Sequence, residues 1–210
     1  MKLGVIVAMD KEYEALQDLA DADLIVKKSG IGKVNAAITA TRLIMEHHPD
    51  CIISTGVAGG IDSSLHVTDI VVAENVAYHD YFIGEEGEGT ELYKPFPCDA
   101  NMIDVARNLV NTSEDMQSAL RFGQIVTGDQ FIQSPDELLA IKSRFPQALA
   151  VDMESCALAH VCNHFDVPFI SFRIISDVVG VENHIEHYHN FWETLTNRSF
   201  DMVVRYIKSL

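Results

Sequence analysis

The chain has 210 residues, of which 48% are hydrophobic and 22% charged, and its formal net charge is -16 at pH 7. This length fits a single domain over residues 1–210 that buries roughly 70–75% of the unfolded chain's surface, and the composition argues against disorder. The strong negative charge argues against nucleic acid or anionic membranes as partners, because like charges repel, but it leaves small neutral ligands open.

Cysteine usage and the N-terminus favour a cytoplasmic protein. The four cysteines form no CxxC pair and are typical of reduced thiols in a reducing compartment; they are Cys51, Cys98, Cys156 and Cys162. The N-terminal MKLGVIVAMDKE has a short apolar run that suits a buried strand better than a signal peptide. No apolar stretch approaches the roughly 20 residues that a membrane helix needs.

Short apolar runs alternate with longer helical patterns, which is typical of βαβ units. The pattern predicts strands at Leu3–Ala8, Asp23–Lys28, Cys51–Thr55, Asp69–Tyr78, Phe122–Thr127, Ala148–Val151 and Phe169–Ser176. It predicts helices at Lys11–Leu19, Val34–His47, Asn101–Val110, Glu154–Phe165 and Tyr188–Ile207, with another starting at the capping box of Ser134 and Glu137. We therefore expect an α/β fold with a mixed, mostly parallel central sheet flanked by helices.

Three segments of this pattern carry specific expectations. In the second helix the apolar face is predicted to consist of Val34, Ala37, Ile38, Thr41 and Met45. Residues 56–60, GVAGG, are expected to form a loop after the third strand. The acidic, glycine-bearing segment 79–98 is expected to be a long loop, and loops of this length are usually functional or disordered.

Acidic residues follow three of the predicted strands. In an open parallel sheet, ligands bind outside the carboxyl ends of the strands. Glu12, Glu154 and Asp177 each stand at such an end. A single acid in this place is explained by the dipole of the following helix. Three acids at one edge of the sheet point to a site.

The glycine-rich segments do not match phosphate-binding motifs. Residues 29–33, SGIGK, resemble a P-loop, but Lys27 stands where the first glycine should be. The GVAGG segment lacks the GxGxxG spacing. Both segments allow close approach of a ligand to the backbone, as a flat sugar or base requires.

The histidines and hydroxyl residues give no further catalytic motif. His184, His187 and His189 lack a metal-ligand spacing and are interpreted as a polar segment before the last helix. There is no GxSxG elbow and no Ser-His-Asp arrangement. We therefore expect neither a metal nor a cofactor.

Seven segments in order resemble the bacterial 5′-methylthioadenosine/S-adenosylhomocysteine nucleosidases over nearly the whole chain. They are VAMDKE, KSGIGKVNAA, STGVAGGI, VAYHD, TGDQFI, AVDMESCALAHVC and RIISDV. The resemblance implies one nucleoside phosphorylase-like domain that hydrolyses the bond between adenine and a 5′-thio-substituted ribose.

The resemblance also implies roles for individual residues. Glu12 acts on the attacking water, Asp177 donates a proton to the purine, and Met153 with Glu154 holds the ribose. The other residues that it places around the substrate are Ala8, Met9, Ile31, Phe131, Ile132, Ser176 and Tyr188. It further implies a homodimer in which the segment 79–98 reaches the partner's pocket, with Pro95, Phe96 and Pro97 suited to that contact.

Independently of the resemblance, these residue types suit the chemistry of such a reaction. A departing purine leaves an oxocarbenium-like sugar, so the leaving nitrogen must be protonated and a nucleophile supplied. Asp177 must then start protonated and Glu12 ionised, and a helix N-terminus favours the ionised form of Glu12. Two acids in contrasting environments are the usual arrangement for this task.

Other functions remain open from the sequence. A purine nucleoside phosphorylase is disfavoured because Asp10 and Glu12 would repel phosphate, and Lys33 and Arg173 are expected to have structural roles. A futalosine-type nucleosidase and a non-catalytic nucleoside-binding module are the remaining alternatives. Val57, where many relatives have serine, and the short connection Ala20–Lys28 leave the preferred 5′ substituent undetermined.

Overall fold

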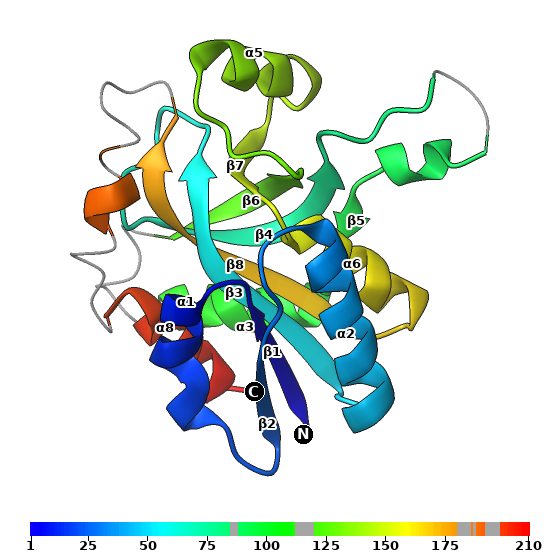
Figure 1. Cartoon of the computed structure of the whole chain (residues 1–210). Helices are drawn as coiled ribbons and strands as arrows, with labels where there is room; N and C mark the ends of the chain where they lie inside the picture. The colour runs from blue at the N-terminus through cyan, green and yellow to red at the C-terminus, as the bar shows by residue number, and fades with distance from the viewer. Residues whose placement is uncertain (85–87, 112–119, 180–185, 187, 192–197) are drawn as a thin grey trace.

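A computed structural model describes residues 1–84, 88–111, 120–179, 186, 188–191 and 198–210 (Figure 1). The strands are β1 (Leu3–Val7), β2 (Leu24–Lys28), β3 (Cys51–Gly60), β4 (Ile70–Tyr78), β5 (Phe96–Pro97), β6 (Leu120–Thr127), β7 (Ala148–Asp152) and β8 (Phe169–Val178). The helices are α1 (Asp10–Leu16), α2 (Lys33–His47), α3 (Ala100–Asn111), α5 (Pro135–Arg144), α6 (Ser155–His164) and α8 (Arg198–Ile207), with 3-10 turns η1 (Gln17–Leu19) and η2 (Thr90–Tyr93).

The strands form one mixed sheet that curls on itself. β1 pairs in parallel with β2 on one side and with β3 on the other. β3 continues in parallel with β8, β8 runs antiparallel to β4, β4 is parallel to β6, and β6 is parallel to β7. β7 then returns to the end of β3 through Gly59 and Gly60. Five strands thus close a ring in which each has a neighbour on both sides.

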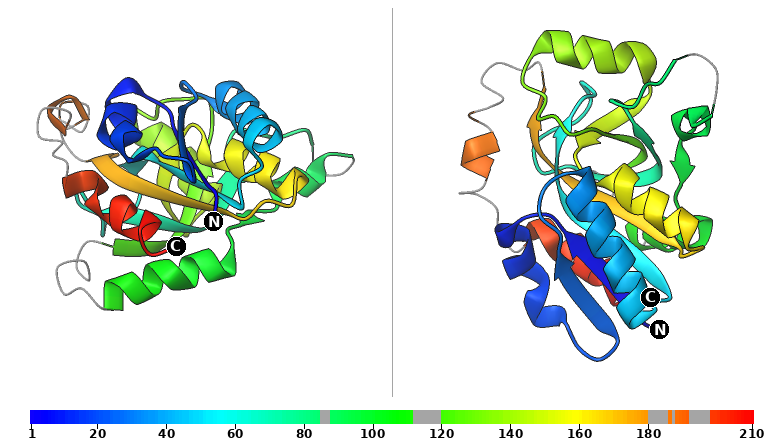
Figure 2. Two further views of the ribbon diagram at one scale, coloured as in Figure 1. Left: turned by 90° about the horizontal axis from the view of Figure 1, so that it is seen from below. Right: turned by 45° about the vertical axis from the view of Figure 1, so that its right-hand side comes forward.

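Helices cover both faces of this sheet, as predicted. Figure 2 shows α2 and α6 side by side on one face and α3 and α8 on the other. Between them, β3 and β8 supply fully buried side chains such as Ile53, Ile170 and Phe172. Within the part of the chain that the structure describes, no helix is long and apolar enough to cross a membrane.

The GVAGG segment is not a loop, contrary to the sequence prediction. These residues form the second half of β3 and pair with β8 along their whole length. Glycine disfavours strands on its own, but here pairing with β8 along the segment, and with β7 at Gly59 and Gly60, outweighs that preference. The register shifts between Ala58 and Gly59, opposite Ile175 and Asp177, so β8 has a β-bulge at this point.

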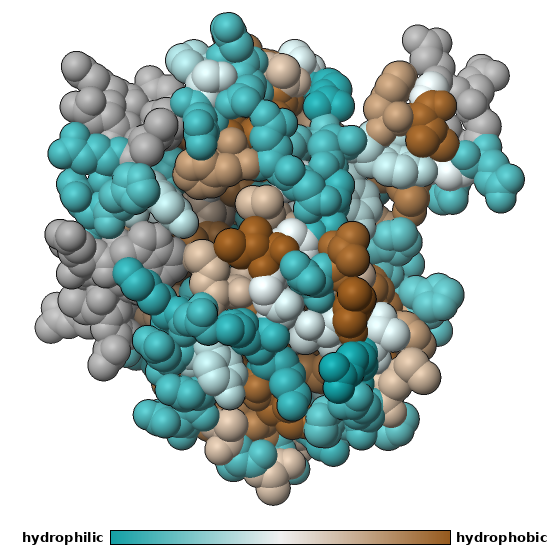
Figure 3. Space-filling model, in the orientation of Figure 1, coloured by the Kyte–Doolittle hydropathy of each residue, from teal (hydrophilic) through white to brown (hydrophobic). Residues whose placement is uncertain are grey.

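The predicted apolar face of α2 is also wrong. Val34, Ile38 and Met45 are 69%, 54% and 62% exposed. The helix packs its opposite side on the sheet, and that side consists of Ala36, Ala40, Leu43 and Ile44. Two alanines on the packed side allow a close approach that larger residues would prevent, so the bulky apolar side chains face outward. Figure 3 shows hydrophobic surface, coloured brown, over α2.

The last predicted helix is only partly described. Tyr188 to Phe191 are helical and α8 covers Arg198–Ile207, but residues 192–197 between them lie outside the described residues. The other predicted helices and strands are confirmed, with ends that differ from the prediction by a few residues. The segment 79–98, expected to be a loop, contains η2 and the short strand β5, which pairs with β4.

Candidate active site

A cavity of about 300 Å³ lies where β1, β3, β7 and β8 end. All residues that the sequence assigned to the site line it: Ala8, Met9, Glu12, Ile31, Phe131, Ile132, Met153, Glu154, Ser176, Asp177 and Tyr188. Residues that the assignment missed line it too: Val57, Ala58, Gly59, Gln130, Val151, Asp152 and Val179. Most of these belong to the extension of β3 or to the ends of β7 and β8, which were predicted too short.

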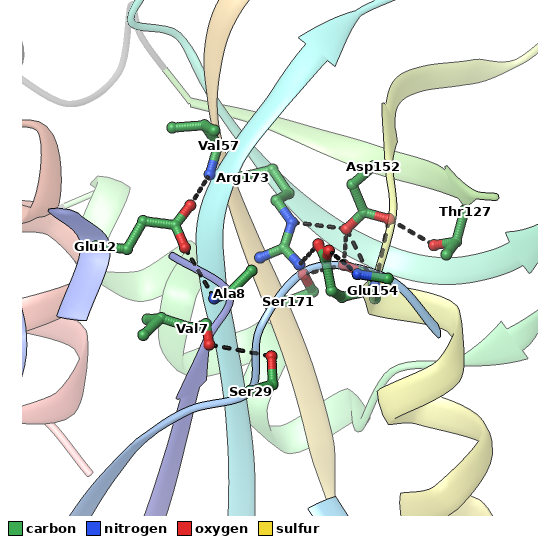
Figure 4. A network of polar contacts seen from close by, with 12 residues as sticks. Val7, Ala8, Glu12, Ser29, Val57, Thr127, Asp152, Glu154, Ser171 and Arg173 are labelled. Atoms are coloured by element: carbon green, nitrogen blue, oxygen red, sulfur yellow. Dashed lines mark hydrogen bonds and ion pairs between the residues drawn. The ribbon is translucent and has the colours of Figure 1, made fainter. Parts of the chain in front are cut away.

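Glu12 is buried and held by backbone groups. It stands in the first turn of α1, and its Oε2 accepts hydrogen bonds from the N–H groups of Ala8 at 2.8 Å and Met9 at 2.9 Å. Its Oε1 accepts one from Val57 N–H at 3.0 Å (Figure 4). A Cβ atom at Gly56 would lie 2.6 Å from Oε1, so only glycine leaves room for this carboxylate.

Burial raises the pKa of Glu12, while the charge of Arg173 and the three N–H donors act in the opposite direction. The three N–H groups all need an acceptor, and an ionised carboxylate can accept hydrogen bonds at both of its oxygens, so these donors favour the ionised form of Glu12. The net upward shift of the pKa makes Glu12 a stronger base than an exposed glutamate. A carboxylate in this place can accept a proton from a group in the cavity.

Glu154 and Asp152 share a buried cation, Arg173 (Figure 4). The Nε of Arg173 lies 2.6 Å from Asp152 Oδ2, and its second terminal nitrogen lies 3.9 Å from Glu154 Oε2. Asp152 also accepts hydrogen bonds from Thr127 Oγ1 and from Ser155. Burial, together with the charge of Asp152, raises the pKa of Glu154 to about 7.

The backbone of the SGIGK turn also fixes Glu154. Gly32 N–H donates to Glu154 Oε1 at 2.9 Å. Gly32 has a φ of 95°, a conformation that favours glycine, and it directly precedes α2. The next residue, Lys33, bonds Asp80 Oδ2 through Nζ at 2.6 Å and Asp129 Oδ1 through its N–H at 2.8 Å. The turn is thus anchored, and Glu154 lines the cavity together with Met153 and Ile31.

Lys33 and Arg173, for which the sequence predicts structural roles, are both paired with carboxylates. Lys33 is engaged by Asp80 and Asp129, and Arg173 by Asp152 and Glu154. The side chain of Arg173 is only 3% exposed. Neither cation is arranged as a cradle for a phosphate ion.

Asp177 reaches the cavity from the bulge in β8. Its Oδ1 accepts a hydrogen bond from Ser176 Oγ at 2.7 Å, and Ser176 Oγ also donates to the carbonyl of Ala58 at 3.2 Å. Both residues are buried. A bulge changes the direction of successive side chains, and here it places Ser176 and Asp177 along the same cavity.

Aromatic side chains stand at the mouth of the cavity. The rings of Phe131 and Tyr188 lie 5.1 Å apart, and Phe131 is partly exposed. Ile132 is buried behind them. Together they offer a flat apolar surface that suits a planar heterocycle.

Among the residues that the structure describes, no group of three or more His, Cys, Asp or Glu side chains is placed to hold a metal ion. Of the predicted histidine segment, His189 belongs to a short helical stretch, whereas His184 and His187 lie outside the described residues.

Comparison with known proteins agrees with this geometry. A family model described as the Phosphorylase superfamily matches residues 18–208. The 5′-methylthioadenosine/S-adenosylhomocysteine nucleosidase of Tolumonas auensis is 36% identical over 233 aligned positions and covers 100% of both chains. The enzyme of the same name from Staphylococcus saprophyticus is 37% identical, covering 99% of this chain and 100% of its own.

Solved structures show the same relationship. The Neisseria meningitidis nucleosidase in complex with methylthio-immucillin-A superposes with a TM-score of 0.89 at 31% identity, covering 100% of this chain and 99% of that one. A Borrelia burgdorferi protein bound to adenine superposes with a TM-score of 0.90 at 30% identity, and the match covers 99% of this chain and 100% of that one. The chain belongs to the phosphorylase superfamily and, within it, to the family of 5′-methylthioadenosine/S-adenosylhomocysteine nucleosidases.

The buried ion pair at the site yields a stability prediction. Asp152→Asn leaves Arg173 buried without its closest negative partner, so we expect the free energy of unfolding to fall by about 3–5 kcal/mol. Asp10→Asn, which removes an exposed ion pair with Lys28, is the matched control and costs under about 1 kcal/mol. Denaturant unfolding measures both variants, and equal losses would contradict the importance of the buried pair.

Proposed function

We propose that this chain hydrolyses the N-glycosidic bond of 5′-methylthioadenosine, S-adenosylhomocysteine or both, releasing adenine and the 5′-thioribose. The observation that carries the proposal is the pairing of two buried acids, Glu12 and Asp177, on one cavity with different surroundings. Glu12 is surrounded by backbone donors, while Asp177 has a serine hydroxyl beside it. Relatives of this chain carry the name of this activity, and their structures hold adenine or a methylthio analogue.

In the proposed mechanism the two acids act at opposite ends of the breaking bond. Asp177 donates its proton to the seven-position nitrogen of adenine as the electrons of the glycosidic bond move into the base. Water attacks the cationic sugar carbon, and Glu12 accepts the proton that the water loses. Glu154 and Met153 hold the ribose hydroxyls, while Phe131 and Ile132 contact the base. Ala8, Met9 and Ile31 line the sugar end, and Tyr188 covers the mouth.

Water rather than phosphate is the nucleophile in this proposal. The turn after β1 presents Asp10 and Glu12, which repel an anion, and Lys33 and Arg173 are already paired with carboxylates. A phosphorylase needs cationic or amide-rich groups at the nucleophile position. The charges around Glu12 therefore favour hydrolysis.

The activity assay tests this directly. Adenine release from 5′-methylthioadenosine should proceed at full rate in phosphate-free buffer and yield the free 5′-thioribose. Inosine, with and without phosphate, serves as the comparison substrate. Finding a sugar 1-phosphate as the main product would rule out the hydrolase.

Three substitutions separate the proposed roles. Asp177→Asn removes the donated proton but keeps the shape, so turnover should fall by about 10²–10⁴-fold. Glu12→Gln should abolish hydrolysis while a non-cleavable 5′-thioadenosine analogue still binds. Glu154→Gln weakens a charged hydrogen bond worth about 1.5–3 kcal/mol, so affinity and rate should both decline. Calorimetric binding beside rate measurements distinguishes the three, and near-native turnover of Glu12→Gln would contradict its role in water activation.

We also infer that the protein acts as a homodimer. The exposed face of Val34, Ile38 and Met45 on α2 is a contiguous apolar surface of the kind that marks an interface. Phe82 and Ile83 are exposed on the segment that projects from the body (Figure 1). These two fit a contact with a second copy better than Phe96, which belongs to β5 and packs against Tyr78 and His160 of its own chain.

A charge placed on α2 tests the dimer. Ile38→Asp should shift the protein to monomers at micromolar concentration, because an aspartate cannot be buried unpaired in an apolar interface. Leu139→Asp on α5, an exposed leucine away from this face, should leave the association unchanged. Sedimentation measures both variants, and a fully active wild-type monomer would exclude the dimer.

The proposal places the activity in the cytoplasm, on one domain over residues 1–210. All four cysteines are free and buried, which suits a reducing compartment. Burial raises the pKa of the Cys51 and Cys98 thiols to about 12, so neither is a reactive thiolate at neutral pH.

A further inference from the structure

Asp129 lies beside the candidate active site without being part of its wall. It follows β6 and directly precedes the segment Gln130–Ile132, whose three residues all line the cavity. Asp129 itself does not line the cavity, and its side chain is 47% exposed. It has no task in the proposed mechanism, yet its contacts reach the turn that holds Glu154.

The carboxylate of Asp129 caps helix α2 from a distant part of the chain. The N–H group of Lys33, the first residue of α2, donates to Asp129 Oδ1 at 2.8 Å across a separation of 96 residues. The N-cap position of this helix is Gly32, which has no side chain to accept that hydrogen bond. A carboxylate at a helix N-terminus satisfies a free N–H group and meets the positive end of the helix dipole. Asp129 thus replaces the missing N-cap side chain.

The same carboxylate packs against the residue that binds Glu154. A Cβ atom at Gly32 would lie 3.2 Å from Asp129 Oδ1, so the carboxylate lies close to the glycine backbone. The N–H group of Gly32 donates to Glu154 Oε1 at 2.9 Å. Asp129 and Glu154 therefore bind two successive main-chain N–H groups, and a displacement of the first carboxylate moves the donor that holds the second.

Asp80 fixes this arrangement from the end of β4. Its Oδ2 accepts hydrogen bonds from Lys33 Nζ at 2.6 Å and from the N–H group of Asp129 at 2.9 Å. Burial acts to raise the pKa of Asp80, but these hydrogen bonds hold that pKa below its usual value. Asp80 is therefore ionised at neutral pH, and Asp80, Lys33 and Asp129 form a closed set of contacts between β4, α2 and the loop after β6.

We propose that Asp129 is a positioning residue for Glu154. It fixes the start of α2, and with it the Gly32 N–H group that orients the carboxylate of Glu154 toward the ribose hydroxyls. Because the chain continues from Asp129 into Phe131 and Ile132, one residue sets the base-binding segment and the ribose-binding carboxylate relative to each other. This inference rests on the proposed function and adds to it a residue that acts without touching the substrate.

The test measures how strongly the enzyme selects for ribose hydroxyls. The quantity is the ratio of kcat/KM for 5′-methylthioadenosine to kcat/KM for its 2′-deoxy and 3′-deoxy analogues, and comparing variants cancels the intrinsic reactivity of each substrate. Asp129→Ala should lower this ratio by about three- to tenfold, because Glu154 loses its alignment. Asp129→Asn keeps an acceptor oxygen for the Lys33 N–H group and should retain the ratio of the wild-type protein.

Asp136→Ala is the matched control. Asp136 is an exposed acid in the first turn of α5, and it does not line the cavity. Its removal changes the net charge by the same amount as Asp129→Ala and should leave the ratio unchanged. Because the side chain of Asp129 is about half exposed, its truncation leaves the core intact, and Asp129→Ala is expected to fold.

A double-mutant cycle separates positioning from a general effect on the fold. In a Glu154→Ala background the contact that Asp129 aligns is already gone, so adding Asp129→Ala should change the ratio no further. A loss caused by a loosened fold or by weaker binding of the base would persist in that background.

The outcomes distinguish this inference from the proposed function. If the wild-type protein released no adenine from 5′-methylthioadenosine, the proposed function itself would fail. Efficient turnover by the wild-type protein, with a ratio that changes less than about twofold in Asp129→Ala, would overturn the positioning role alone. An equal loss in Asp129→Asn or Asp136→Ala, or an undiminished loss in the Glu154→Ala background, would overturn it as well.

Discussion

The rest of the site depends on the buried ion pairs of the Arg173 guanidinium with Asp152 and Glu154. Arg173 projects from β8 and joins Asp152 at the end of β7 to Glu154 at the start of α6. Removing two carboxylates from water is costly unless a cation and hydrogen bonds compensate them. Arg173, Thr127 and Ser155 supply that compensation, so negative side chains remain beside a cavity that is otherwise largely apolar.

The ring of strands sets the relative positions of Glu12 and Asp177, the proposed base and the proposed acid. β3 donates the Val57 N–H group that holds Glu12, and two residues later Gly59 lies opposite Asp177 across the bulge. One continuous strand thus contacts both groups. Because β3 is paired with β8 on one side and with β7 at its end, the backbone groups beside Glu12 and Asp177 keep fixed relative positions.

The residues that the sequence assigned to a site lie together on one cavity, whereas two of the elements around it differ from the prediction. Glu12, Glu154 and Asp177 were found because strand ends converge in a parallel sheet, which is a local rule. The strand character of residues 56–60 was missed because glycine propensity opposes it and only pairing with distant strands reveals it. The orientation of α2 was missed for a related reason. Its alanines pack against the sheet, and the periodicity of the sequence does not show that the bulkier apolar residues of the helix face away from the sheet. The ion pair between Asp152 and Arg173 joins residues on different strands, so no spacing in the sequence indicates it.

Val57 binds Glu12 through its main-chain N–H group. The side chain of Val57 takes no part in that hydrogen bond. A different side chain at position 57 therefore leaves the Glu12 carboxylate with its three backbone donors. Gly56 is under the opposite constraint, since any side chain would collide with that carboxylate. Two adjacent positions therefore differ sharply in the side chains that they accept, and position 57 is a place where the cavity wall can be reshaped while the carboxylate of Glu12 keeps its position.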